Sequence, residues 1–454
     1  MFHSPRAGAV AAARQIGPRS ATRFVMDGRV RRVHSVRMKI LIAGGGAAGF
    51  FAAIEARRRN PAAEVLLVEK SREWLAKVSI SGGGRCNVTN VCSEPRLLAA
   101  NYPRGSRELL GPFHRFNSSH TVAWFESRGV PLKAEPDGRM FPVTDSSRTV
   151  VDCLLREASL AGVKMENLRG ITGARFDAAR GLFEVELSDR TRVDADRLVI
   201  CTGGNLNSGG WEAAAALGHT IETPVPSLFT FHLSDPRLEG LSGISVPDVE
   251  LSVPGRKLMQ RGPLLVTHWG LSGPAVLKLS AWGARELHDV DYRFPLRINF
   301  APGRNEAWAR EALARMRVEH GRAKVVNHRP VDLPQRLWER LVAQAGAGEA
   351  IWSMLPRAAA EHLAGALVNS RFEVTGKSMN KDEFVTCGGV RLSEVDFRTF
   401  ESRLQPGLFF AGEVLDIDGV TGGFNFQAAW TGGWTAGRHA ARGDGEVTGS
   451  TDQD

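Results

Sequence analysis

A glycine-rich segment near the start of the chain has the residue types and the spacing needed to bind a dinucleotide. Gly44-Gly45-Gly46-Ala47-Ala48-Gly49 follows the apolar run 40–43 and opens an alanine-rich stretch. In such a loop the first glycine permits a sharp turn, the second lets the backbone approach a pyrophosphate, and the third lets the helix pack on the strand. The start of the next helix offers free N–H groups and partial positive charge to the phosphates.

An acidic residue follows this loop at the expected distance. Glu69 comes twenty positions after Gly49 and ends a second apolar run, 65–68. Its carboxylate can accept a hydrogen bond from a ribose hydroxyl. The alternative is an ordinary β–α–β unit with a glycine turn and a surface glutamate. The predicted dinucleotide contacts here are Gly44, Gly45, Gly46, Ala47, Ala48, Gly49, Glu69 and Lys70.

A second cluster, the segment 79–90, contains three successive glycines followed by polar residues. The glycines expose backbone N–H groups, and Arg85 supplies a fork of donors for phosphate or carbonyl oxygens. A flexible surface loop is the alternative interpretation. Because the segment comes soon after Glu69, we expect it to contact the same cofactor. The predicted contacts are Gly84, Arg85, Cys86 and Asn87.

A third cluster, 412–427, comes near the end of the chain and follows a buried strand. An acid at the strand end can bind a ribityl hydroxyl. N–H groups at the start of the next helix can face the electron-rich edge of a reduced flavin. A nicotinamide dehydrogenase has no need for this third cluster, so the cofactor predicted is FAD. The predicted contacts here and in the glycine turn 202–204 are Thr202, Gly203, Gly204, Gly412, Glu413, Asp416, Gly422, Gly423 and Asn425.

Three residues are candidates for catalysis: His268, Arg85 and Asn425. His268 can titrate near neutral pH and act as an acid or base beside a flavin, or it can be a hydrogen-bonding residue of a structural hinge. Cys86 is either near the flavin ring or a small packed residue. No second cysteine lies two or four residues away, so a flavin–disulfide relay is not expected. No metal site is predicted, because the five cysteines show no metal-ligand spacing.

The elements that must position these residues alternate between strands and helices, which predicts an α/β fold. The expected strands are 38–43, 64–69, 197–201 and 408–413, with a hairpin at 133–141 and a meander over 171–193. The expected helices are 47–59, 118–128, 146–162 and 424–441. The return strand 197–201 should lie near the first glycine loop in a doubly wound sheet.

The chain divides into five expected regions. The FAD-binding domain is discontinuous, and two regions with a different composition are inserted in it. The regions are a disordered basic extension (1–37), the FAD-binding domain (38–204 and 371–441), a β-rich inserted domain (205–302), a helical inserted subdomain (303–370) and a disordered tail (442–454).

The charge is concentrated at one end. The formal net charge is +9, and residues 1–37 hold eight arginines and one acid, so they carry +7 and the other 417 residues only +2. A nearly neutral body argues against a broad phosphate-binding surface. We therefore expect no nucleic-acid partner. We expect the extension to be a disordered segment translated from an upstream start or, as the alternative, an organellar transit peptide.

Neither a membrane span nor a secreted scaffold is expected. No run of eighteen apolar residues occurs, and the scattered cysteines suit a reducing, cytoplasmic setting. The sequence does not indicate the oligomeric state.

In order along the chain the sequence contains KILIAGGGAAG, SGGGRCNVTN, LVICTGG, THWGLSGPAVLKLS and FFAGEVLDIDGVTGGFNFQAAW. Over about 38–441 it resembles the BaiN-like (YhiN-like) FAD-dependent flavoproteins, a family that includes aminoacetone oxidase and a bile-acid reductase. The resemblance implies non-covalent FAD and a two-segment Rossmann-like FAD-binding domain with an inserted β-barrel-like subdomain and a small helical subdomain. One motif departs from the family: Phe424-Asn425-Phe426-Gln427 and Ala428-Ala429-Trp430 replace Tyr-Asn-Leu/Phe-Gln-Trp-Ala.

The predicted function is an FAD-dependent oxidoreductase acting on a small organic substrate, with O2 as acceptor or NAD(P)H as a transient electron donor. Only one complete GxGxxG loop occurs, which favours direct oxidation of the substrate. A second hypothesis is an RNA-associated flavoprotein of the tRNA-modification type, with the basic extension as an RNA-binding arm. A third is a protein that uses FAD only as a structural element.

Overall fold

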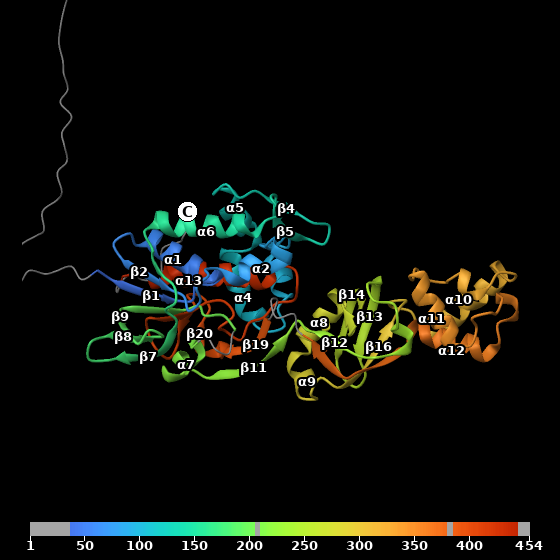
Figure 1. Cartoon of the computed structure of the whole chain (residues 1–454). Helices are drawn as coiled ribbons and strands as arrows, with labels where there is room; N and C mark the ends of the chain where they lie inside the picture. Colours follow the sequence, from blue (N-terminus) through green and yellow to red (C-terminus); the bar gives the residue numbers. More distant parts are fainter. Residues whose placement is uncertain (1–36, 205–208, 379–384, 444–454) are drawn as a thin grey trace, which may run out of the picture. The chain divides into compact units, whose positions relative to one another are not determined.

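A seven-stranded sheet joins the beginning and the end of the folded chain (Figure 1). The computed structural model describes residues 37–204, 209–378 and 385–443. The expectations for most of 1–37 and 442–454 lie outside these residues. The strand order is β20-β21-β22-β10-β1-β2-β6. The strands are β1 (Lys39–Ala43), β2 (Glu64–Val68), β6 (Lys164–Glu166), β10 (Arg197–Ile200), β20 (Val395–Asp396), β21 (Glu401–Ser402) and β22 (Leu408–Phe410).

The five strands from β22 to β6 are parallel. Residues Ile40 to Ala43 of β1 are buried on both faces, which is why this run is continuously apolar instead of alternating. The chain leaves β1 toward β2 and returns later to β10 on the other side of β1. The edge between β1 and β10 is therefore a topological switch point, where ligands bind in open α/β sheets.

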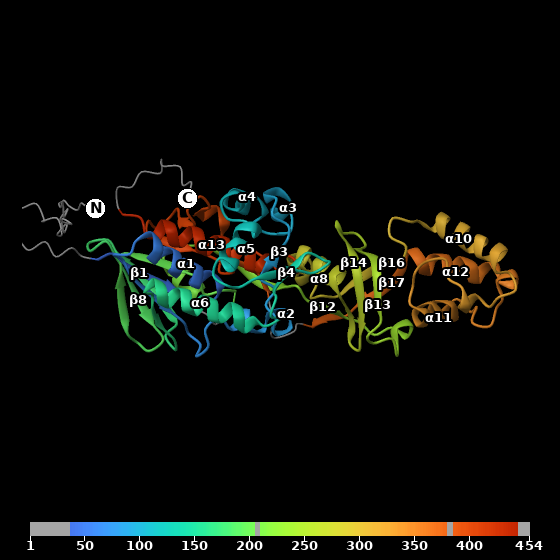
Figure 2. The same cartoon turned by 90° about the horizontal axis from the view of Figure 1, so that it is seen from above.

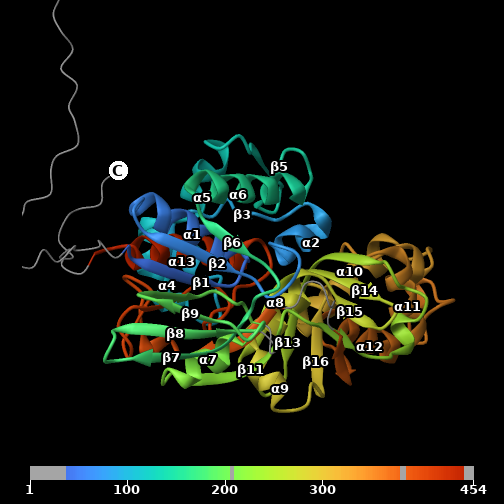
Figure 3. The same ribbon diagram turned by 60° about the vertical axis from the view of Figure 1, so that its left-hand side comes forward.

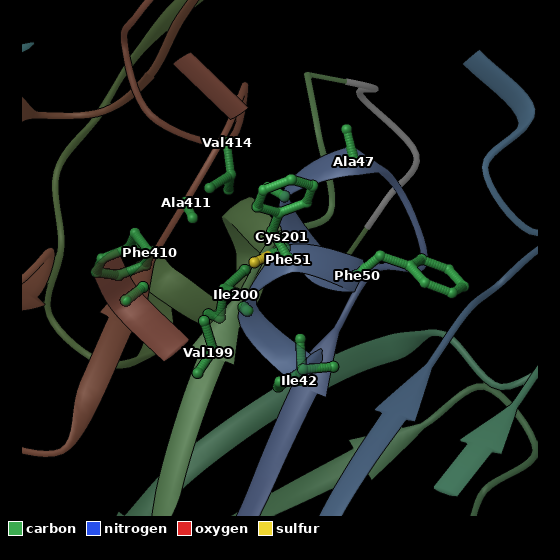
Figure 4. Close-up of a cluster of buried hydrophobic side chains, with 14 of the residues drawn as sticks. Ile42, Ala47, Phe50, Phe51, Val199, Ile200, Cys201, Phe410, Ala411 and Val414 are labelled. Carbon is green, nitrogen blue, oxygen red and sulfur yellow. The ribbon is translucent and has the colours of Figure 1, made fainter. Parts of the chain in front are cut away.

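Two helices from opposite ends of the chain pack together on this sheet (Figure 2). They are α1 (Ala47–Arg59) and α13 (Phe424–Ala440), and α6 (Ser147–Ala161) packs on α1. Their contact is close because Gly433 and Gly437 of α13 face the backbone of α1. Figure 4 shows buried side chains of β1, α1, β10 and the segment after β22 gathered in one cluster.

Most of the elements expected between 118 and 200 are confirmed. Helix α5 lies at the expected place. The hairpin β4–β5 and the meander β7–β8–β9 are antiparallel, also as expected. A short strand, β3, extends the hairpin sheet. The bounds are α5 (Ser118–Glu126), β3 (Thr89–Asn90), β4 (Leu132–Ala134), β5 (Arg139–Pro142), β7 (Ile171–Asp177), β8 (Leu182–Leu187) and β9 (Arg192–Ala195).

Several short helices were not expected from the sequence. They contain glycine or proline, or are too short to show helical periodicity: Pro112 lies inside α4, and α2 ends in three successive glycines, of which Gly82 and Gly83 have non-helical φ/ψ. These residues are unfavourable in helix interiors and hide the helical signal. The four helices are α2 (Ala76–Gly84), α3 (Pro95–Ala99), α4 (Ser106–Arg115) and α7 (Gly210–Ala216).

A second seven-stranded sheet, which is antiparallel, has the order β17-β16-β13-β14-β15-β12-β18. Its two edge strands are successive parts of the segment 370–378, so one stretch of chain pairs with β16 at one edge and with β12 at the other. The sequence had assigned 371–378 to the FAD-binding domain. A five-residue strand carries no signal for which sheet it joins. The bounds are β12 (Thr230–His232), β13 (Ser245–Val253), β14 (Leu258–Thr267), β15 (Gly270–Ser272), β16 (Phe294–Asn299), β17 (Ser370–Val374) and β18 (Gly376–Ser378).

The region expected to be β-rich, 205–302, also contains the helices α7, α8 (Pro274–Trp282) and α9 (Ala284–His288). Helix α8 begins with Gly273 at a φ of 96° and Pro274 at its first position, an arrangement in which proline is favoured. The region expected to be helical contains α10 (Glu306–Glu319), α11 (Gln335–Gln344) and α12 (Arg357–Val368). A two-stranded sheet pairs β11 (Ile221–Ser227) with β19 (Val385–Val390).

The buried apolar residues form two large clusters. One belongs to the parallel sheet (β1, β2) and the other to the antiparallel sheet (β13, β14, β16), and Figure 3 shows the ribbons of both sheets. The first cluster also contains side chains of α1, α6 and α13, together with Trp211 of α7. The second also contains side chains of α8, α10, α11 and α12. Residues 209–217 thus pack with the parallel sheet, although the sequence placed them in the insertion.

We predict that Gly437→Ala destabilises the protein by about 1–3 kcal/mol, as other overpacked cores are destabilised. A Cβ at this position would lie 2.2 Å from the carbonyl oxygen of Ala52, so α1 and α13 would have to separate. Urea unfolding followed by circular dichroism measures the change. The matched control is Gly365→Ala in α12, where a Cβ meets open space and where alanine should stabilise the helix. Equal unfolding midpoints for the two variants would contradict the close contact.

Candidate functional site

Four of the predicted cofactor-binding segments meet at one edge of the parallel sheet. β1, β2, β10 and β22 are parallel neighbours, so their carboxyl ends lie together. The residues that follow these ends are the first glycine loop, Glu69, the turn 202–204 and Gly412. Cys201 N donates to Ala43 O at 2.7 Å, which confirms that the return strand lies beside the first glycine loop.

Three glycines of the first loop have no room for a side chain. A Cβ on Gly44, whose φ is 115°, would lie 2.3 Å from Cys201 O. A Cβ on Gly45 would lie 2.4 Å from the ring of Trp74, and one on Gly49 would lie 1.8 Å from Gly44 O. The loop therefore depends on glycine for turn geometry and for backbone contact.

The start of α1 has the properties of an anion site. Gly46 is the N-cap and has no side chain, and no carboxylate lies in the first turn. A Cβ on Gly46 would meet nothing within 4 Å. The first N–H groups of Ala47 and Ala48 have no partner within a helix. This uncapped, positively polarised end fits the pyrophosphate of FAD.

Glu69 is held at the rim of the loop. Its Oε2 accepts a 2.6 Å hydrogen bond from Gly45 N, and its Oε1 accepts from Ser71 N at 2.8 Å. A carboxylate has about four acceptor positions, so a ribose hydroxyl can still donate to it. Lys70, beside it, is exposed.

The second cluster has the open, glycine-dependent backbone expected of it. Gly82, Gly83 and Gly84 have φ of 59°, 69° and 82°. Gly83 and Gly84 are exposed, and a Cβ on either would meet nothing within 4 Å. These residues leave room for a ligand at the end of α2.

Two asparagines connect the second cluster to the third. With its amide oriented to satisfy both partners, Asn87 Nδ2 donates to Thr89 O at 3.0 Å, and its Oδ1 accepts from Gly423 N at 2.9 Å. Asn90 Nδ2 donates to Gly422 O at 3.0 Å. The two glycine loops, more than 300 residues apart in sequence, are thus one hydrogen-bonded unit.

Asn425, a predicted catalytic residue, closes the third loop on itself. Its Oδ1 accepts from Gly419 N at 2.8 Å, and its Nδ2 donates to Gly419 O at 3.0 Å. Both polar groups of the amide therefore hold the loop. The start of α13 has no side-chain cap, so the backbone N–H groups there can face a ligand.

The acids of the third cluster are engaged by protein groups. Glu413 Oε2 pairs with Lys77 Nζ at 2.7 Å, and its Oε1 accepts from Thr386 N at 3.0 Å. Asp416 Oδ2 accepts from Arg285 at 2.8 Å, and its Oδ1 accepts from Gly388 N at 2.9 Å. A ribityl hydroxyl at Asp416 would have to share or replace these bonds.

The turn 202–204 contains one buried polar group without a hydrogen bond to the described residues. This group is the Oγ1 of Thr202. Gly204 O accepts from Thr386 Oγ1 at 2.7 Å. Gly203 has a φ of 74°, and a Cβ on it would meet open space.

Arg85 and Cys86 do not form a reactive pair. Arg85 donates to Glu135 at 2.6 Å, and its guanidinium lies 4.0 Å from the centre of the Phe141 ring. Burial raises the pKa of the Cys86 thiol to about 12, and the side chain is 0% exposed. Of the two interpretations of Cys86, a residue near the flavin ring or a small packed residue, the structure supports the packed residue.

His268 lies in the turn between β14 and β15, and its side chain is exposed. Its ring contacts the neighbouring ring of Trp269, with 4.2 Å between the centres. No hydrogen bond of the imidazole is found among the described residues.

Sequence reasoning missed a buried charge pair next to the third loop. Arg104 donates through Nε to Asp418 Oδ1 at 2.5 Å and through NH1 to Ala281 O at 2.7 Å. Ser227 Oγ donates to Asp418 Oδ2 at 2.6 Å. Burial raises the pKa of Asp418, although Arg104 opposes this. The sequence contains no motif that would have identified Arg104.

A comparison with known protein families decides the family. Residues 38–439 match the family described as HI0933-like protein Rossmann domain. The chain belongs to the HI0933-like family. This confirms the resemblance to BaiN-like (YhiN-like) flavoproteins, and the chain is an FAD-dependent oxidoreductase with an α/β, Rossmann-like FAD-binding fold and additional antiparallel sheets.

Three relatives of this chain carry two different activities in their names. A ribosomal RNA dihydrouridine synthase of Escherichia coli K12 is 31% identical over 413 residues, 88% of this chain and 96% of that protein. A 3-dehydro-bile acid delta(4,6)-reductase of Clostridium scindens is 29% identical over 89% of this chain and 99% of that protein. A ribosomal RNA dihydrouridine synthase of Haemophilus influenzae is 26% identical over 86% of this chain and 95% of that protein.

These relatives contradict the expectation that nucleic acid is excluded as a partner, because two of the three carry the name of an RNA-modifying enzyme. That expectation depended on the low net charge outside 1–37, and net charge does not report how charges are distributed on a surface.

Within the described ranges, no helix combines the length and apolar character of a membrane span.

We predict that Glu69→Gln weakens FAD binding by about tenfold or more, since a hydrogen bond to a charged group contributes about 1.5–3 kcal/mol. Titration of the apoprotein with FAD, followed by flavin fluorescence, measures the affinity. The control is Glu73→Gln, an exposed acid of the same segment. If both variants bind FAD as the unmodified protein does, Glu69 has no part in the site.

We predict that Cys86 resists alkylation in the native protein. With a pKa of about 12, roughly one thiol in 10⁴ is deprotonated at pH 8, and only the thiolate reacts. The partly exposed Cys92 should react first with iodoacetamide, as mass spectrometry of the digested protein can show. Both should react after unfolding. Rapid labelling of native Cys86 at pH 8 would show that it is reactive.

Proposed function

We propose that this FAD-dependent oxidoreductase reduces a uridine of ribosomal RNA to dihydrouridine. The observation that carries this proposal is the 31% identity to a ribosomal RNA dihydrouridine synthase over 96% of that protein. A second relative with the same name, covered to 95%, supports it. The RNA-associated alternative of the sequence analysis therefore replaces oxidation of a small substrate as the leading hypothesis.

The site residues divide into two groups along the cofactor. We place the pyrophosphate on residues 44–49 and the adenosine ribose at Glu69. We place the flavin end near the second and third clusters, where α13 begins without a side-chain cap. Positive polarisation of that helix start would stabilise negative charge on a reduced ring. Asn87 and Asn425 act as positioning residues, because their amides hold the loops.

The domain division proposed here has three parts. They are a two-segment FAD-binding domain, an inserted β-barrel-like subdomain and a small helical subdomain. The separate apolar clusters and the segment that pairs with both edges of the antiparallel sheet support it. We move the insertion boundaries to about 228 and 378 on this basis.

The reaction adds two hydrogens across a carbon–carbon double bond of uracil. Bound FAD, when reduced, supplies one hydrogen with both electrons, and a general acid supplies the other as a proton. A net reduction requires an external donor, and we propose NAD(P)H in that role. His268 remains the candidate proton donor, since its side chain is exposed while Arg85 and Asn425 are engaged elsewhere.

A second candidate function is reduction of an unsaturated small molecule. The relative that supports it is the 3-dehydro-bile acid delta(4,6)-reductase, which this chain matches over 99% of that protein's length. The two candidates share the reaction class and differ in the substrate.

We predict that the purified protein with FAD and NADPH or NADH forms dihydrouridine in ribosomal RNA that lacks this modification. Nucleoside analysis by mass spectrometry detects the two added hydrogens. An unsaturated 3-ketosteroid incubated in parallel tests the second candidate. Reduction of the steroid without dihydrouridine in RNA would overturn the proposed substrate.

Two variants serve as comparisons in this assay. His268→Gln should retain flavin reduction by the nicotinamide donor and lose dihydrouridine formation, if His268 supplies the proton. Glu73→Gln, an exposed residue, should behave as the unmodified protein.

A further inference from the structure

A basic cleft lies on the parallel-sheet part of the molecule, between α4 and the segment 392–403. Its volume is about 600 Å³. The predicted FAD contacts are not among its lining residues. The residues that line it are Arg107, Glu108, Gly111, Pro112, Arg115, Leu392, Ser393, Val395, Asp396, Phe397, Arg398 and Arg403.

The charges of this cleft favour an anionic ligand. Four arginines and two carboxylates line it, which leaves a net charge of +2. Asp396 pairs with Arg398 at 2.6 Å and lies 3.9 Å from Arg403, so it neutralises only part of their charge. Arg107 is exposed and makes no ion pair within the described part of the chain. Arginine presents a planar fork of donors that matches phosphate oxygens.

The cleft also contains one aromatic ring. Phe397 is partly exposed, its ring packs edge-on against Phe400 with 5.1 Å between centres, and its carbonyl oxygen accepts from Arg115 at 3.2 Å. Bases of single-stranded nucleic acid stack on such rings, while arginines contact the backbone. An acidic peptide would use the arginines but would have no base to stack on the ring.

Both walls of the cleft are attached to the third glycine cluster. Phe113 of α4 packs on Tyr102 with 5.5 Å between ring centres, and Tyr102 Oη donates to Phe424 O at 2.6 Å. The opposite wall follows Val390, which bridges Leu415. The cleft is thus connected through these contacts to the segment predicted to lie at the flavin end.

We propose that this cleft binds the phosphodiester backbone of the RNA substrate, outside the site of reduction. The inference rests on the proposed function and deepens it, because it assigns a surface to RNA recognition. It also explains how a body with little net charge can bind RNA: the positive charge is local. Binding through Arg107 and Arg398 should depend on salt, since each phosphate contact releases counterions.

The test compares two double variants of the full-length, FAD-loaded protein. Arg107→Gln with Arg398→Gln removes two positive charges from the cleft. Arg148→Gln with Arg293→Gln removes two elsewhere, at side chains that are 80% and 68% exposed. The probe is a fluorescent single-stranded RNA of about twenty nucleotides that contains uridines, with anisotropy measured over a range of KCl concentrations. FAD content and thermal midpoint verify folding.

The cleft variant should bind the RNA about tenfold more weakly, and its slope of log affinity against log salt should fall by about 1.4, at about 0.7 per contact to a single strand. The control variant should match the unmodified protein. Equal effects in both variants, or none in the cleft variant, overturn the cleft proposal and leave the proposed function intact if the unmodified protein still forms dihydrouridine. Failure of the unmodified protein to bind or reduce RNA overturns both.

Discussion

The parallel pairing of β1 with β10 is the constraint on which the rest of the site depends. It places Gly44 against the backbone of Cys201, where a Cβ would lie 2.3 Å from a carbonyl oxygen. Because β10 also pairs with β22, the same contact brings the last part of the chain to the first glycine loop. The predicted cofactor site thus forms only when strands about 370 residues apart have met, and its geometry depends on the core of the parallel sheet.

At this edge the side chains mostly hold loops, and the backbone remains for binding. The amides of Asn87 and Asn425 and the carboxylate of Asp416 all bond to backbone groups of glycines. The second and third clusters both contain glycines at positive φ, among them Gly83 and Gly422. A glycine loop therefore needs such polar partners, since buried backbone groups are costly to leave unpaired. The N–H groups at the starts of α1 and α13 stay available for a ligand.

The distribution of charge in space bears directly on whether the protein can bind nucleic acid. The +2 of residues 38–454 is a sum over surfaces that differ from one another. α4 and the segment 392–403 bring four arginines together from positions almost 300 residues apart, and no window of the sequence contains that cluster. The same limit explains why nucleic acid was wrongly excluded: a sum of charges cannot describe a local field.

The sequence by itself determined the cofactor class, the strands β1, β2, β10 and β22, the helix pair α1 and α13, and the family. These features are encoded locally, in glycine spacing and in apolar runs. Only the tertiary structure decided what the predicted polar residues do. Asn425 closes its loop, Arg85 pairs with Glu135, and Arg104 joins Asp418. It also assigned the segment 370–378 to the antiparallel sheet. These outcomes depend on partners far away in the chain, and the type and position of a residue do not specify which partner it will meet.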